Sequence, residues 1–234
     1  VSYIFIIMFF LTFLYGINHP KNYNNLQTTS PVNNNLSQPP LFDILKDAYP
    51  HIQFYTEYDN YVGDWKIQIT NKNRSEILYY AHGKLLPKDE LKNESLYTTF
   101  LYHYPKEVPN PKNFTENDIN RILEVSNPKK RTENKGTSPF FYNFIYDVKD
   151  RIKTESHIKK MLFLGKSTNV HDFLHDKLNL VQNEIYQWAK KDSEVLNFVN
   201  KIQSADSYSW RSISDSGKRS FHSMGLALDI LPKG

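Results

Sequence analysis

The feature that most restricts the possible folds of this chain is an alternating stretch close to its last residues. Read as a β-strand, the stretch places three large apolar side chains on one face: Leu226, Leu228 and Ile230. Because side chains alternate with period two, the other face carries two very small residues and one carboxylate: Gly225, Ala227 and Asp229. We therefore expect one face to pack against a core and the other to form a nearly bare floor around Asp229.

A histidine precedes this strand at a spacing that suits metal binding. Gly225 lies between His222 and Asp229 and lets the backbone bend, so we expect His222 to turn back toward Asp229. An imidazole nitrogen and a carboxylate oxygen both bind zinc, at about 2.0–2.2 Å. The pair therefore suggests a zinc site, and a plain hydrogen bond between the two side chains is the alternative interpretation.

These residues belong to a longer pattern, Ser-x-His-x-x-Gly-x-Ala-x-Asp, which begins at Ser220 and follows Tyr208-Ser209-Trp210-Arg211. The pattern resembles the first metal-binding segment of the D-alanyl-D-alanine carboxypeptidase and L,D-endopeptidase family, which are zinc peptidases of the lysostaphin and hedgehog-like group. The resemblance covers Tyr208 to Ile230. Weaker matches to the amino-terminal region of spirochaete-type members lie upstream, at Trp65, Tyr80 to Pro87 and Tyr102 to Pro105.

The resemblance implies a zinc-dependent hydrolase that cuts peptide bonds of peptidoglycan. It makes His222 and Asp229 metal ligands, and it gives Arg211 the role of holding the substrate carbonyl or carboxylate, which a guanidinium group suits. A surface ion pair between Arg211 and Asp215 is the alternative. Ser220 is expected to orient the loop that carries His222 and not to act as a nucleophile.

In the family, a third ligand, which is a histidine, and a glutamate that acts as general base follow near the carboxyl end. Neither residue type occurs after Asp229 in this sequence. The expectation is therefore that the carboxyl-terminal part of the peptidase domain is missing; a decayed copy, or completion of the site by His171 or His175, are the alternatives. Two other functions remain open: a non-catalytic, anchored envelope protein that binds peptidoglycan through Arg211 and an aromatic surface, and a helical interaction protein built on residues 139–203.

Composition narrows the remaining possibilities. With 234 residues, of which 39% are apolar, the chain has room for one ordinary domain and a leader. Its net charge of +4 comes from lysines spread along the sequence, so nucleic acid is not an expected partner. Lys218 and Arg219 are interpreted as solvated charges, and cations on the substrate side of the site are the alternative. The absence of cysteine excludes disulfides, thiolate zinc sites and a cysteine nucleophile. The sequence does not indicate an oligomeric state.

Four segments are expected along the chain. Residues 1–17 are almost entirely apolar and uncharged, which is typical of a signal peptide or an uncleaved membrane anchor; a buried core helix is the alternative. Residues 18–40 read as an Asn/Pro-rich linker. These are followed by a mixed α/β amino-terminal region at 41–205 and by the first part of a zinc peptidase domain at 206–234. The protein is therefore expected to be exported to the cell envelope, periplasmic or extracellular, with membrane contact through residues 2–17 if the leader is not cleaved.

The expected fold class is α+β, with a helical amino-terminal half leading into a small antiparallel sheet of the hedgehog and D-Ala-D-Ala peptidase type. Strands are predicted at 65–69 and 77–81, joined by a turn, and at 97–104. Helices are predicted at 43–48, from Thr115 to Val125, at 139–152, at 168–190 and from Asp192 or Ser193 to Ile202. The helix at 168–190 would place His171 and His175 one turn apart, as a second candidate metal pair.

Overall fold

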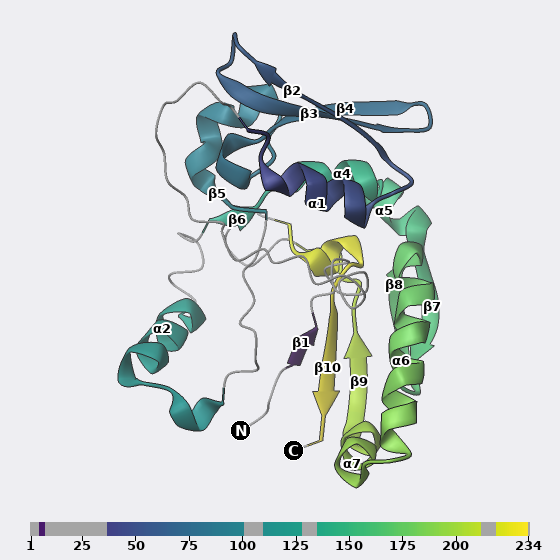
Figure 1. Cartoon of the computed structure of the whole chain (residues 1–234). Helices are drawn as coiled ribbons and strands as arrows, with labels where there is room; N and C mark the ends of the chain where they lie inside the picture. The colour runs from purple at the N-terminus through teal and green to yellow at the C-terminus, as the bar shows by residue number, and fades with distance from the viewer. Residues whose placement is uncertain (1–4, 8–36, 101–109, 128–134, 212–218, 234) are drawn as a thin grey trace. The chain divides into compact units, whose positions relative to one another are not determined.

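The computed structural model describes residues 5–7, 37–100, 110–127, 135–211 and 219–233. They form two compact units, whose elements are labelled in Figure 1. Unit 1 contains residues 5–7, 110–127, 142–211 and 219–233, and unit 2 contains residues 37–100 and 135–141. Helices and small, mostly antiparallel sheets occur in both units, so the predicted α+β class is confirmed. The expected segment boundary between residues 205 and 206 falls inside strand β9 (Ile202–Asp206).

The centre of unit 2 is a three-stranded antiparallel sheet. It consists of β2 (Gln53–Asp59), β3 (Asp64–Asn71) and β4 (Arg74–Tyr79) in that order. The hairpin predicted around residues 71–75 is confirmed as β3–β4, and its turn begins with Lys72 at a φ of 53°. Strand β2 was not predicted, so the amino-terminal half is less helical than expected. Buried apolar side chains form the core of this unit: Phe42, Leu45, Ile67, Ile69, Leu78, Leu85 and Phe141.

Short elements complete unit 2. The predicted helix at 43–48 is confirmed as α1 (Pro40–Ala48), which begins earlier because a proline suits the first helical turn. Two 3₁₀ segments, η2 (Ala81–Gly83) and η3 (Lys88–Leu96), follow the sheet. Strand β5 (Tyr97–Thr98) pairs in parallel with β6 (Gly136–Thr137). The strand predicted at 97–104 is thus observed only at its start, and its residues 101–104 lie outside the described residues.

Tyr97 in this unit should make the stability of the protein sensitive to alkaline pH. Its hydroxyl donates a hydrogen bond to the Glu90 carboxylate at 3.0 Å, and burial together with this bond raises the pKa of Tyr97 to about 12. Because an unfolded tyrosine titrates near pH 10, the folded state holds this proton longer, and stability is lost as pH rises from about 10 to about 12. We expect Tyr97→Phe to lose less stability over that range than wild type, measured by urea unfolding.

The control for this experiment is Tyr61→Phe, because Tyr61 is 92% exposed. That variant should follow the wild-type profile. Equal slopes for wild type and Tyr97→Phe between pH 10 and about 12 would contradict the assignment of the hydrogen bond.

Unit 1 is built around a second antiparallel sheet, which appears as the neighbouring arrows β1, β10 and β9 in Figure 1. Strand β10 (Leu228–Pro232) pairs with β9 on one side and with β1 (Phe5–Ile7) on the other. The strand predicted from Leu226 is confirmed, although the regular pairing begins at Leu228. Asp229 and Asp206 are direct partners in the β10–β9 register. Large apolar side chains of this unit are buried: Val148, Phe163, Val170, Leu178, Leu228 and Ile230.

A β-hairpin occupies the region where the sequence predicted the beginning of the helix at 168–190. Strands β7 (Ile158–Phe163) and β8 (Lys166–His171) are joined by Leu164 and Gly165, both at positive φ, as in the tight turns that match the twist of a hairpin. The chain then passes through η5 (Asp172–Leu174) into α6 (His175–Ala189). The prediction of one helix over 168–190 is therefore wrong for its first turns, where β-branched Thr168 and Val170 favour a strand.

The remaining helices follow the predicted positions with one interruption. The helix predicted at 139–152 is two helices, α4 (Phe140–Ile145), which begins in unit 2 and ends in unit 1, and α5 (Arg151–His157). Between them, Asp147 has a φ of 54° and the Asp150 side chain caps α5. Helix α7 (Ser193–Lys201), capped by Asp192, is confirmed. So is α2 (Glu116–Ser126), which follows η4 (Pro111–Asn113) and begins with a capping box between Thr115 and Asp118.

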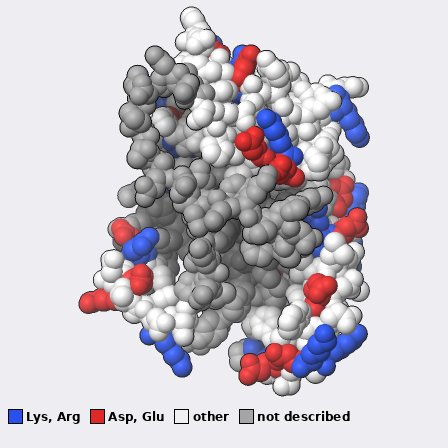
Figure 2. Space-filling model, viewed as in Figure 1, with Lys and Arg blue, Asp and Glu red and all other residues white. Residues whose placement is uncertain are grey.

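The apolar segment 2–17 is described only at β1, and its other residues, like residues 18–36 of the expected linker, lie outside the described residues. Among the residues that the structure describes, no helix is both long and apolar enough to cross a bilayer. On the face shown in Figure 2, lysine and arginine side chains lie among aspartate and glutamate side chains. This intermixing fits a net charge that is spread along the sequence.

Candidate metal site

The histidine of the sequence pattern lies on a short 3₁₀ turn, η6 (Phe221–Met224). The Ser220 side chain caps this turn by accepting a hydrogen bond from the His222 backbone N–H at 3.2 Å. The Ser223 hydroxyl donates to the Ser220 carbonyl at 2.7 Å, which closes the turn from the other side. These bonds fix the backbone from which the His222 side chain extends.

Gly225 ends the turn and redirects the chain into β10. Its φ of 69° lies in the left-handed region, which glycine adopts without steric cost. Its carbonyl accepts a hydrogen bond from the His171 N–H at 3.0 Å, so β8 packs directly against the turn. The predicted reversal is confirmed: His222 Nε2 lies 3.3 Å from Asp229 Oδ2.

The protonation of His222 follows from its second hydrogen bond. His222 Nδ1 lies 2.8 Å from the Ser207 carbonyl oxygen, and a carbonyl only accepts, so Nδ1 carries a proton. In the neutral imidazole, Nε2 then presents a lone pair toward the Asp229 carboxylate. The other carboxylate oxygen, Asp229 Oδ1, is buried and has no hydrogen-bond partner among the described residues. Two acceptors thus face each other, and this arrangement is favourable only with a cation between them, either a proton or a metal ion.

A pocket of about 300 Å³ opens beside this pair within unit 1. Its walls include Thr168 and Asn169 of β8, Ser207 after β9, and Arg211, in addition to His222 and Asp229. The Tyr208 N–H donates to the Asn169 carbonyl at 3.0 Å and so joins β8 to the segment that follows β9. The pocket is therefore formed where β8, the end of β9 and η6 meet.

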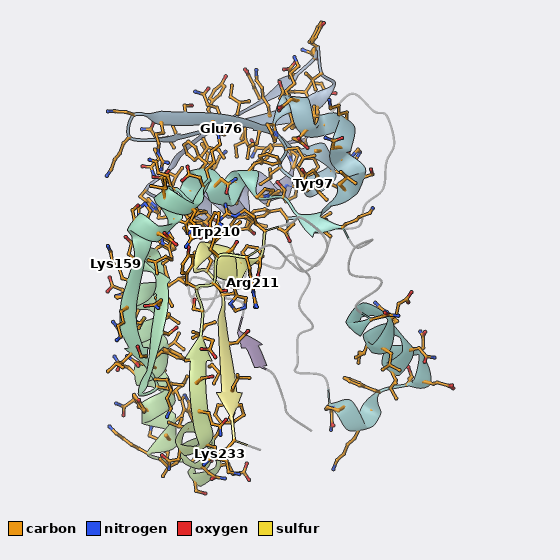
Figure 3. The ribbon with its side chains drawn as sticks, turned by 180° about the vertical axis from the view of Figure 1, so that it is seen from behind. Glu76, Tyr97, Lys159, Trp210, Arg211 and Lys233 are labelled. Carbon is orange, nitrogen blue, oxygen red and sulfur yellow. The ribbon has the colours of Figure 1, made fainter. Side chains whose placement is uncertain are left out.

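Arg211 is an exposed residue of this pocket. Figure 3 shows Trp210 and Arg211 near the start of β10, at the opposite end of the strand from Lys233. Within the described part of the chain, Arg211 forms no hydrogen bond or ion pair. Asp215, the alternative partner considered from the sequence, lies outside the described residues. The Arg211 guanidinium is therefore an exposed cation on the wall of the pocket.

A second group of possible ligands lies in the same unit. His157, His171 and Asp172 bring three ligand atoms within 4.8 Å of one another. The two imidazole rings are stacked, with centroids 4.9 Å apart and planes at 11°. A metal ion lies close to the plane of each imidazole that binds it, so two stacked rings cannot both direct a lone pair at one ion. In this arrangement the group is a packed cluster and not a metal site.

His171 supports that interpretation. Its Nε2 donates to the Tyr146 carbonyl at 2.9 Å, and its Nδ1 accepts from the Phe173 N–H at 3.2 Å, so both nitrogens are used. Burial lowers the pKa of His171, which favours the neutral ring. His175 begins α6 whereas His171 ends β8, so the prediction that they share a helix is wrong. The two histidines are therefore not spaced by one helical turn, as the prediction required.

Several residues of the site had no signal in the sequence. Ser207 contributes its main-chain carbonyl, which no side-chain pattern can reveal. Thr168 and Asn169 come from the unpredicted hairpin. The interpretation of Arg219 as a solvated charge is wrong, because this side chain is half-buried and bound to backbone carbonyls. Lys218 lies outside the described residues.

The family match found for this chain lies within unit 2. Residues 42–102 match a domain of unknown function, DUF8518. No curated protein matches the chain. No solved structure matches it either. The matched range contains none of the residues of the His222–Asp229 site.

Proposed function

We propose that this chain is a zinc peptidase of the D-alanyl-D-alanine carboxypeptidase type, in which His222 and Asp229 are metal ligands. The observation that carries the proposal is the pair of acceptors, His222 Nε2 and Asp229 Oδ2, at 3.3 Å. Two ligand atoms of one tetrahedral zinc ion lie about 3.3–3.6 Å apart when each is about 2.0–2.2 Å from the metal. The bond from His222 Nδ1 to the Ser207 carbonyl adds the outer contact that metal-binding histidines commonly make.

The proposal gives zinc, Arg211 and Ser220 separate roles in peptide hydrolysis. Zinc, when bound, supplies a Lewis acid beside the scissile peptide carbonyl. Arg211 binds the carboxylate or carbonyl of the peptide, in line with its position on the pocket wall. Ser220 holds the turn from which His222 extends. A catalytic zinc site also needs a third protein ligand. The resemblance places that histidine and the glutamate base after Asp229, and no described histidine, aspartate or glutamate joins His222 and Asp229 as a third ligand.

The finer features of the proposal rest on the sequence pattern. They are a sheet of the hedgehog and D-Ala-D-Ala peptidase type around β9 and β10, peptidoglycan peptides as substrate, and export to the cell envelope. The apolar run at residues 2–17 supports export.

Zinc titration of the 234-residue chain tests the proposal. We expect about one zinc per chain by elemental analysis, and we expect Asp229→Asn to weaken binding by about 100-fold, because a neutral amide is a poor zinc ligand. Asp206→Asn is the matched control, since Asp206 is the register partner of Asp229 and lines the same pocket. A wild type without zinc, or equal losses in both variants, would overturn the proposal.

A second function is favoured by one observation, which is that the described residues supply only two of the three protein ligands that a catalytic zinc site needs. The chain would then bind peptidoglycan without cutting it. Sedimentation with purified peptidoglycan, combined with an assay for released amino acids, separates the two functions. Release supports the peptidase, binding without release supports the non-catalytic protein, and the absence of both contradicts each of them.

A further inference from the structure

Arg219, which lies two positions before the η6 turn, donates hydrogen bonds to that turn and to a distant segment of the chain. Its Nε and Nη2 donate to the Ser223 hydroxyl and carbonyl at 3.4 and 3.2 Å. Its Nη1 donates to the Val148 carbonyl, to the Lys149 carbonyl at 3.3 Å and to Asn143 Oδ1 at 3.3 Å. The guanidinium therefore ties the turn that carries His222 to α4 and to the segment between α4 and α5.

The same guanidinium lies over the indole of Trp210, with 4.7 Å between its central carbon and the ring centroid. Trp210 is the neighbour of Arg211 in the chain. Burial lowers the pKa of Arg219 from its ordinary value, yet an arginine stays charged in proteins, so its charge is stabilised by carbonyls and by the indole face. Hence one side chain contacts the neighbour of the metal-site histidine and the neighbour of the substrate-site arginine.

We propose that Arg219 is a positioning residue that holds His222 and Arg211 in a common arrangement, a proposal that rests on the proposed function of the His222–Asp229 site. Its hydrogen bonds to Ser223 restrain the turn, and Ser223 in turn closes that turn on Ser220. Stacking on Trp210 restrains the backbone immediately before Arg211. Arg219 itself is not among the residues that line the pocket, so it acts through its neighbours.

The planar guanidinium is required for this role. Its five N–H groups diverge in one plane, which lets it reach Ser223 on one edge and the Val148 carbonyl on another while its face stacks on Trp210. A lysine ammonium keeps the charge but reaches only part of this set and does not stack in the same way. The substitution Arg219→Lys therefore separates charge from bridging geometry.

The test compares Arg219→Lys and Arg219→Ala with the wild-type chain of 234 residues, and uses Arg121→Ala on the exposed surface of α2 as the control. We expect zinc affinity, measured well below the unfolding temperature, to fall about tenfold in both Arg219 variants and to stay unchanged in the control. A residue that only stabilises the fold would lower the melting temperature and leave zinc affinity intact, which would overturn the proposal. Should Arg219→Ala fail to fold, Arg219→Lys decides, because full zinc affinity in that variant also contradicts bridging.

A metal-free measurement keeps this test independent of the proposed function. The His222 Nδ1 proton is donated to the Ser207 carbonyl, so in a fixed ring we expect it to exchange slowly with water and to give an NMR signal. We expect this signal to be lost, and the Trp210 indole signal to shift, in both Arg219 variants without zinc. If the wild type binds no zinc, the proposed function fails, but the two NMR signals still test whether Arg219 positions His222 and Trp210. Unchanged signals would overturn its positioning role.

Discussion

Replacing His222 with alanine is expected to weaken zinc binding by the 234-residue chain by at least about 100-fold. The substitution removes Nε2, one of the two proposed ligand atoms, and leaves Asp229 to bind the metal alone. Loss of an outer contact to a metal ligand already costs about 10–100-fold in affinity, so loss of the ligand itself should cost no less. Competition with a coloured chelator measures the affinity, and circular dichroism verifies that the variant is folded.

Two histidine controls make this result specific. His175→Ala removes a residue that the sequence offered as a possible third ligand, and His157→Ala removes one ring of the stacked cluster. Both variants should bind zinc within about twofold of wild type, since neither side chain lies in the pocket beside His222. Loss of zinc in His157→Ala with retention in His222→Ala would move the metal to the cluster and refute the proposed site.

The largest expected effect on stability is that of Gly225→Ala. A Cβ at this position would lie 2.5 Å from Ile158 Cδ1 and 2.8 Å from the His171 backbone nitrogen. Ile158 Cδ1 is the end of a flexible side chain and can shift, but the backbone of β8 cannot, because the His171 N–H is bonded to the Gly225 carbonyl. With the added cost of a φ of 69°, the free energy of unfolding should fall by about 3 kcal/mol. Urea denaturation measures this change.

Gly165→Ala separates the two causes of that loss. Gly165 also belongs to unit 1 and has a φ of 78°, but a Cβ there would meet nothing within 4 Å. This variant therefore carries the backbone cost alone, and we expect a loss of about 1 kcal/mol. If the two alanine variants were destabilised equally, close packing between the η6 turn and β8 would have no measurable energetic role.

Local signals in the sequence predicted local structure well. The capping box at Thr115 and Asp118, the Asp192 cap of α7 and the hairpin β3–β4 each depend on residues that lie within a few positions of one another. The reversal of His222 toward Asp229 belongs to the same class, since Gly225 between them makes it possible. These features were predicted because neighbouring residues are sufficient to determine them.

The features that were missed depend on contacts between distant parts of the chain. Apolar spacing from Val170 to Trp188 suggested one helix, yet the pairing of β8 with β7 determines the first part of that range. His171 therefore became a buried hydrogen-bonding residue instead of a helix-surface histidine. Arg219 is comparable, because Val148 and Lys149 lie about 70 positions earlier, and a sequence pattern around Ser220 contains no sign of them.

The bond between His222 and the Ser207 carbonyl has a consequence for how this protein tolerates sequence change. Its acceptor is main chain, so any residue at position 207 that keeps the local path of the backbone supplies the same oxygen. The backbone path as the chain leaves β9 therefore determines the orientation of the His222 ring. A substitution at position 207 that keeps this path does not remove the hydrogen bond. A change in the path of the chain from Asp206 to Tyr208 would redirect the imidazole, so the site should tolerate substitutions at position 207 but not insertions or deletions beside it.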